Sequence, residues 1–148
     1  RERMHIAASM AGMTIANTCC GLAHAFDQPG PYFGLEHGLV CGIFLPYTTK
    51  FLLPNPIYTT MGQRMGFSGS EEEIGKKLVL FLRDFHQELG LPISFRDAGV
   101  DENQYLAKLD DFIALATESI STRLSPLVPD ARQIKKIFID AYYGNPLY

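Results

Sequence analysis

Apolar side chains recur every three or four positions along most of the chain, which is the period of a helix with one buried face. No run between turn signals alternates apolar and polar residues as a half-buried strand does. The pattern predicts helices over residues 2–26, 37–49 and 57–65, and after Ser70, Asp101 and Asp130. We therefore expect an all-α helical bundle in which residues 1–148 form one domain, since this length and a hydrophobic content of 47% suit a single core.

Capping residues mark the starts of the last three helices. Ser70 followed by Glu73 has the form of a capping box, and Asp101 and Asp130 are favourable N-cap residues. Helix-ending residues follow each of these helices: Gly90 and Pro92, then Pro126, then Gly144 and Pro146. The stripes expected to be buried are Ile74, Leu78, Phe81, Leu82, Phe85 and Leu89; Leu106, Leu109, Phe112, Ile113, Ala116 and Ile120; and Ile134, Ile137, Phe138, Ala141 and Tyr142.

The first two expected helices carry small residues at helical spacing. Ala8, Gly12 and Ala16 lie four apart in one, and Gly38 and Gly42 lie four apart in the other. Such strips let a neighbouring helix approach closely, so we expect both helices to be buried.

Proline and glycine separate these two helices. The segment 27–31 predicts a turn and then a loop to about Glu36, and Pro46 either interrupts or ends the second helix. Residues 6–23 are uncharged, but Glu2 and several polar residues argue against a secretory signal or a membrane span. Because the chain begins with Arg1 and not Met, either another segment precedes it or the chain has been processed.

Charge and cysteine content narrow the possible partners. A net charge of −3 and scattered Lys and Arg residues give no broad basic surface, so we expect neither nucleic acid nor a membrane as partner. Cys19, Cys20 and Cys41 lack the even count and spacing of a disulfide framework or a structural zinc site. We expect the three cysteines to be small core residues and the protein to lie in a reducing, cytoplasmic compartment.

Two histidines lie on either side of the predicted turn. His24 is near the end of one apolar helix and His37 is at the start of the next, so the turn could bring the two imidazoles together. Imidazole suits iron(II) and zinc, but two ligands are too few for a well-held ion. Spacing alone leaves two alternatives, a metal site or hydrogen-bonded histidines at a helix junction. His5 and His86 are expected at the surface.

Several short motifs occur in a recognisable order. They are Ala11-Gly12-Met13, Gly21-Leu22-Ala23-His24-Ala25, His37-Gly38, Leu45-Pro46, Leu89-Gly90-Leu91-Pro92, Ala98-Gly99-Val100 and the final helix. This series resembles the C-terminal helical domain of the iron-containing alcohol dehydrogenases. Because no GxGxxG or P-loop pattern occurs, the nucleotide-binding domain of that family is expected to be absent from this chain.

The resemblance implies a site and a reaction. His24 and His37 correspond to two metal ligands, while an Asp and a His from the upstream segment complete the set around iron(II) or zinc. The metal would act as a Lewis acid while hydride passes between a small alcohol or aldehyde and NAD(P), which binds only when the upstream domain is present. The expected partners are therefore that domain and the substrate.

The loop between the two histidines departs from the family pattern. The family usually has a histidine four residues after His24, where this chain has Gln28, and His37 follows His24 by 13 positions, about one fewer than usual. Gln28 or Asp27 would then occupy the place of that catalytic histidine, and glutamine cannot relay a proton at neutral pH. The alternative function is a non-catalytic helical module derived from such an enzyme. In either case, the apolar face on which the upstream domain would pack is exposed when that domain is missing, and it predicts a homo-oligomer.

Overall fold

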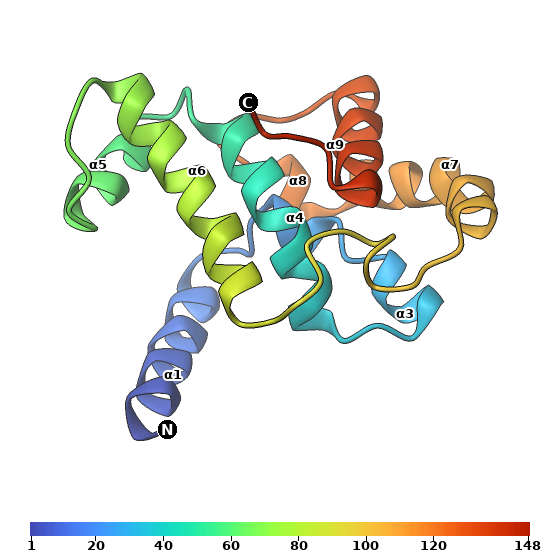
Figure 1. Cartoon of the computed structure of the whole chain (residues 1–148), viewed down its shortest axis with the longest axis horizontal. Coiled ribbons are helices and arrows are strands. Elements are labelled where there is room, and N and C mark those ends of the chain that lie inside the picture. The colour runs from blue at the N-terminus through green and yellow to red at the C-terminus, as the bar shows by residue number, and fades with distance from the viewer.

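The computed structural model describes residues 1–148 and contains helices and connecting segments without any strand (Figure 1). The helices are α1 (Glu2–Asn17), α2 (Leu22–Ala25), α3 (Pro29–Phe33), α4 (His37–Leu52), α5 (Ile57–Arg64), α6 (Glu71–Glu88), α7 (Glu102–Glu118), α8 (Ile120–Arg123) and α9 (Ala131–Tyr143). The expected all-α fold is confirmed. Helices α4, α5, α6, α7 and α9 begin at their predicted positions.

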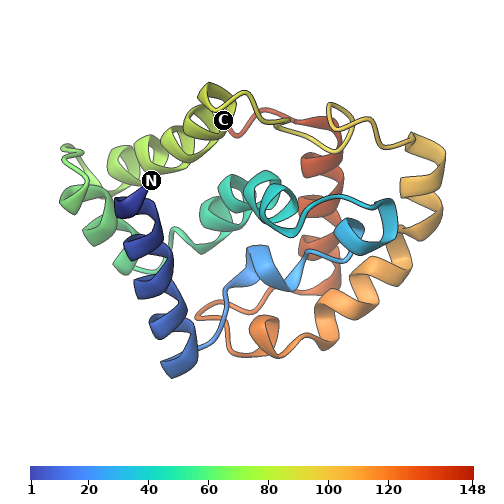
Figure 2. The same ribbon diagram turned by 90° about the horizontal axis from the view of Figure 1, so that it is seen from below.

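Helix α4 lies at the centre, and α2, α6 and α9 pack around it (Figure 2). The ring centroid of its buried Phe44 lies 5.8 Å from that of Phe26, 5.2 Å from Phe95 and 4.9 Å from Phe138. These side chains come from the end of α2, the segment before α7, and α9. Tilted and edge-to-face ring contacts therefore join segments distant in sequence to the central helix.

Side-chain caps begin α6, α7 and α9 as predicted. Ser70 Oγ accepts a hydrogen bond from Glu73 N, and the Glu73 carboxylate accepts one from Ser70 N. Asp130 forms the same reciprocal arrangement with Gln133, and Asp101 accepts from the backbone amide three residues later. These caps satisfy amides that have no partner inside the helix, which is why short-range sequence signals located them correctly.

The predicted buried stripes are confirmed in full only for α9. On α6, Ile74 and Leu78 are buried, but Phe81, Phe85 and Leu89 are 39%, 51% and 58% exposed. Periodicity shows which face of a helix is apolar, but not how far along the helix a neighbour covers it. The predicted stripe after Asp101 is likewise covered in its middle but exposed at Leu106 and Ile120, and Ile120 begins the separate helix α8.

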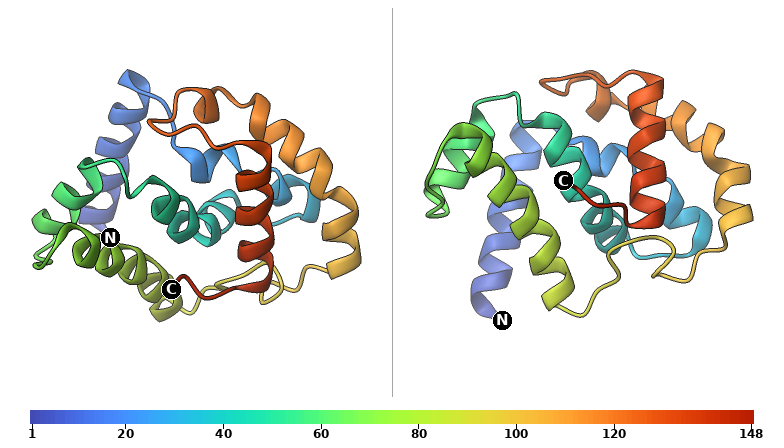
Figure 3. Two further views of the ribbon diagram at one scale, coloured as in Figure 1. Left: turned by 90° about the horizontal axis from the view of Figure 1, so that it is seen from above. Right: turned by 45° about the horizontal axis from the view of Figure 1, so that its top comes forward.

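The prediction of one buried helix over residues 2–26 is wrong. Helix α1 ends at Asn17, contributes no buried residue and extends from one edge of the molecule (Figure 3). The side chains of Asn17 and Thr18 donate hydrogen bonds to the carbonyl oxygens of Met13 and Thr14, which favours an end to the helix there. Nothing lies within 4 Å of the position that a Cβ on Gly12 would occupy, so no second helix approaches the small-residue strip.

Residues 29–36 and Pro46 also differ from expectation. The predicted loop contains helix α3, which has proline in its first turn and ends at Gly34 with φ of 68°. Helix α4 continues through Pro46 to Leu52, with Thr48 donating its hydroxyl hydrogen toward the carbonyls of Phe44 and Leu45. No helix combines the length and apolar character that spanning a membrane demands.

Gly42 permits the close approach of α6 to α4, as its position predicted. A Cβ at Gly42 would lie 2.3 Å from Cε1 of His86, whose Nε2 donates a hydrogen bond to the Pro92 carbonyl at 3.0 Å. The expectation that His86 is a surface residue is therefore wrong, because its ring packs partly buried between the two helices.

We expect Gly42→Ala to lower the free energy of unfolding by about 1–3 kcal/mol relative to Gly38→Ala, because the new methyl group displaces the His86 ring. Gly38 lies in the same helix with open space around it, so its replacement should be neutral or slightly stabilising. Urea denaturation followed by circular dichroism measures both. Equal stabilities of the two variants would contradict the close contact.

Candidate metal centre

His24 and His37 lie side by side although they belong to different helices. Leu22, Ala25 and Phe26 are buried and hold α2 against α4, which leaves His24 on the exposed side of α2. His37 is the first residue of α4 and is also exposed. Their ring centroids are 4.8 Å apart with an interplanar angle of 72°.

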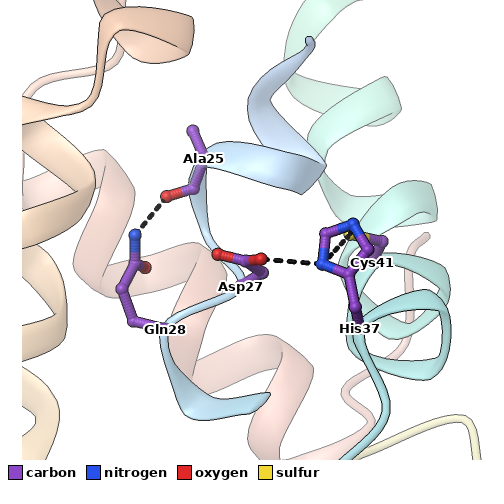
Figure 4. A network of polar contacts seen from close by, with 5 residues as sticks. All are labelled: Ala25, Asp27, Gln28, His37 and Cys41. Atoms are coloured by element: carbon purple, nitrogen blue, oxygen red, sulfur yellow. Dashed lines mark hydrogen bonds and ion pairs between the residues drawn. The ribbon is translucent and has the colours of Figure 1, made fainter. Parts of the chain in front are cut away.

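Asp27 joins the two histidines in one cluster. Its Oδ2 lies 2.7 Å from His37 Nδ1 (Figure 4), and one donor atom from each of His24, Asp27 and His37 lies within 4.8 Å of the others. The carboxylate comes from the turn between α2 and α3, directly after the buried Phe26. Three groups that bind divalent ions therefore converge at the junction of α2, α3 and α4.

Gln28 points away from this cluster (Figure 4). Its Nε2 donates a hydrogen bond to the carbonyl of Ala25 at 2.6 Å, and its Oε1 is buried without a partner. The side chain lines a separate cleft with Tyr32, Lys108 and Phe112. The structure thus brings together three of the four residues singled out in the sequence and leaves Gln28 on the opposite side of the turn.

Cys41 is a neighbour of the cluster that the sequence did not single out. Its Sγ lies 3.6 Å from His37 Nε2, one helical turn further along α4. Burial, together with the charge of Asp27 and the nearby Cys20, raises the pKa of the Cys41 thiol from 9.0 to about 11. The spacing of four residues from His37 is the signal that could have identified it.

All three cysteines are free and partly buried, so the expectation that they are core residues is wrong. A free thiol is consistent with the absence of a disulfide framework in the sequence. Cys19 Sγ lies 3.4 Å from Ser121 Oγ, which places it against α8. His5 lies exposed on α1, as predicted, and takes no part in the cluster.

A cleft of about 340 Å³ opens beside His24 and Cys41. Its walls come from the end of α1, α2, α4 and α5, and its apolar side chains include Ile15, Leu22, Leu45, Leu52 and Tyr58. A small apolar molecule could bury its carbon atoms there with a polar end toward the His24 imidazole. The cavity of about 280 Å³ between α4 and α9 contains neither histidine.

Comparison with known proteins matches residues 1–142 to the sequence model described as "Fe-containing alcohol dehydrogenase family, C-terminal". The chain belongs to this family. The structure of an iron-containing alcohol dehydrogenase from Thermococcus thioreducens superposes with a TM-score of 0.83 at 27% identity, covering 96% of this chain and 37% of the other. The resemblance inferred from the motifs and the fold that it implied are confirmed.

Full-length relatives show what share of an enzyme this chain represents. The chain is 30% identical to an alcohol dehydrogenase of Thermococcus barophilus, over 97% of this chain and 37% of the relative. It is 28% identical to an NADPH-dependent butanol dehydrogenase of Clostridium saccharobutylicum, over 98% and 38%. A bifunctional aldehyde-alcohol dehydrogenase of Escherichia coli matches 98% of this chain over 19% of its own length, at 29% identity. The chain therefore spans less than two fifths of each relative.

The raised pKa of Cys41 predicts slow alkylation. At pH 8 a pKa of about 11 leaves a thiolate population about 100-fold below that of a thiol with a pKa of 9.0. The alkylation rate of Cys41 should rise tenfold per pH unit up to about pH 10, as the thiolate population does. Mass spectrometry after iodoacetamide treatment measures this rate. Labelling at pH 8 as fast as in the urea-unfolded chain would contradict it.

Proposed function

We propose that this chain is the metal-binding helical part of an enzyme that transfers hydride between a small alcohol or aldehyde and NAD(P). The observation that carries the proposal is the convergence of His24 and His37, which lie 13 positions apart on two helices and expose their rings on one face. Family membership supports the reaction class. Since the chain spans 37–38% of two full-length relatives, an upstream domain would supply the nucleotide site and further ligands.

The donor set fits the metals implied by the family. Iron(II) and zinc both accept imidazole nitrogen and carboxylate oxygen, and the cluster presents two imidazoles and one carboxylate within 4.8 Å. When bound, the metal would supply Lewis acidity toward the oxygen of the alcohol or aldehyde. The neutral thiol of Cys41 is the weaker donor beside them, because its pKa is about 11.

The residues around the cluster have distinct roles in this proposal. His24 and His37 are the metal ligands, and the apolar cleft beside His24 holds the carbon chain of the substrate and excludes water. Asp27 and Gln28 are the candidates for the place of the family's catalytic histidine. Asp27 is the better placed of the two, because its carboxylate faces the imidazoles whereas the amide of Gln28 bonds to Ala25. The three free thiols support a reducing, cytoplasmic setting.

A second candidate function is a non-catalytic helical module. Gln28 supports it, because an amide cannot relay protons and its side chain is turned away from the cluster. In that case the chain would fold and associate through its helices without transferring hydride.

A fusion of this chain to the upstream part of the Thermococcus barophilus enzyme tests the catalytic role. We expect it to oxidise a short alcohol with NAD(P), and His24→Ala to lower kcat/KM by at least about 1000-fold, since several kcal/mol of transition-state stabilisation would be lost. His5→Ala, which changes an exposed histidine on α1, should leave the rate unchanged. An active His24→Ala fusion would rule out the role given to His24, and an inactive parent fusion would favour the non-catalytic module.

Exposed apolar side chains on α1 and α6 predict self-association of the isolated chain. Met10, Met13, Phe85 and Leu89 are each more than half exposed, and burying them between copies would remove apolar surface from water. Light scattering should show dimers or larger species, and Phe85→Ser should shift the population toward monomer. A purely monomeric parent chain at moderate concentration would contradict this.

A further inference from the structure

Asp27 provides the metal centre with a donor beyond the two histidines. The family resemblance assigned the ligands His24 and His37 from this part of the enzyme and placed the remaining ones upstream. The family resemblance implies that the turn at Asp27 departs from the usual pattern, with about one residue fewer between His24 and His37. At this turn a carboxylate oxygen lies within hydrogen-bonding distance of the His37 imidazole (Figure 4) and within 4.8 Å of a ring nitrogen of His24.

The distances within the cluster suit three ligands of one ion. Two atoms bonded to one metal at about 2.1 Å and at a right angle lie about 3 Å apart, and opposite ligands lie about 4 Å apart. His37 Nδ1 and Asp27 Oδ2 are already 2.7 Å apart, and the largest separation among the three donor atoms is 4.8 Å. Small side-chain rotations therefore suffice, and the exposed rings of His24 and His37 are free to make them.

The Asp27 carboxylate has no competing partner. Its only hydrogen bond within the chain is to His37, and about a quarter of the side chain, 27%, is accessible to solvent. Placing it on a metal would require no buried contact to break. Two imidazoles and one carboxylate form a donor set that is found around non-haem iron(II) and catalytic zinc. Three protein ligands leave at least one coordination position open for water or for a substrate oxygen atom.

We propose that Asp27 is a direct metal ligand, and that His24, Asp27 and His37 suffice to hold one divalent ion before an upstream domain adds its own ligands. The proposal rests on the assignment of His24 and His37 in the proposed function, and it replaces the catalytic-histidine place considered there for Asp27 with a metal-binding role. It differs from a role in which Asp27 only orients His37 through the hydrogen bond, as carboxylates behind metal-bound histidines commonly do.

Titration of the 148-residue chain with Zn²⁺ alone, by calorimetry, tests the proposal. We expect one ion per chain, with His24→Ala and His37→Ala each greatly weakening binding. Asp27→Asn should weaken it by more than about 100-fold, beyond the effect of a residue that only orients a ligand, because the amide oxygen still accepts from His37 but is a poor ligand. Asp27→His should restore binding to within about tenfold of the parent, because imidazole can replace the carboxylate as a ligand.

Two controls separate the metal effect from charge and folding. Glu36→Gln removes an exposed negative charge next to His37 and should leave the affinity unchanged. Circular dichroism of each variant should match that of the parent. With Co²⁺ as probe, the visible absorption bands should shift in Asp27→His, because nitrogen replaces oxygen in the coordination sphere.

The outcomes separate a failure of the Asp27 proposal from a failure of the proposed metal centre. A loss below about 100-fold in Asp27→Asn, or a cobalt spectrum that Asp27→His leaves unchanged, would overturn the role of Asp27 while leaving both histidines as ligands. A parent chain that binds no Zn²⁺ would overturn the self-sufficient site, and the fusion enzyme would still test His24. Unchanged binding in His24→Ala and His37→Ala would overturn both the inference and the proposed metal centre.

Discussion

The contact of Phe26 with Phe44 and Phe138 is the interaction on which the candidate site depends. Helix α2 has four residues, too few to be stable by its own hydrogen bonds, so tertiary packing must hold it in place. Phe26 directly follows α2 and is fully buried between α4 and α9. Because His24 lies two residues before this anchor, the position of its imidazole is determined by the burial of the aromatic ring.

The same packing separates the structural and chemical faces of the junction. Apolar side chains of α2 and α4 point into the core, whereas His24 and His37 point to solvent with Asp27 beside them. The exposed imidazoles are accessible from solvent, as a metal ligand set must be before the ion binds. This arrangement agrees with membership of a family whose full-length members are more than twice as long as this chain.

Helix α1 and the end of α6 expose apolar side chains instead of burying them. Met10, Met13, Phe85 and Leu89 are each more than half exposed, and Phe85 stacks on Phe81 of the same helix. A monomeric protein rarely leaves a continuous apolar surface uncovered. These exposed faces are the apolar surface that the proposed self-association would bury.

The sequence by itself determined the all-α class, the starts of α6, α7 and α9 and the family, because helical period, capping residues and ordered motifs are local properties that can be read one segment at a time. The break after Asn17 was missed, since side-chain bonds to the backbone ended a helix whose apolar pattern continued. Burial along α6 and the position of His86 depended on where α4 lies, which no local pattern contains. Only the tertiary structure decided that Asp27 faces His37 while Gln28 turns away, because the direction of each side chain in that turn follows from the packing of α2 and α3 against α4.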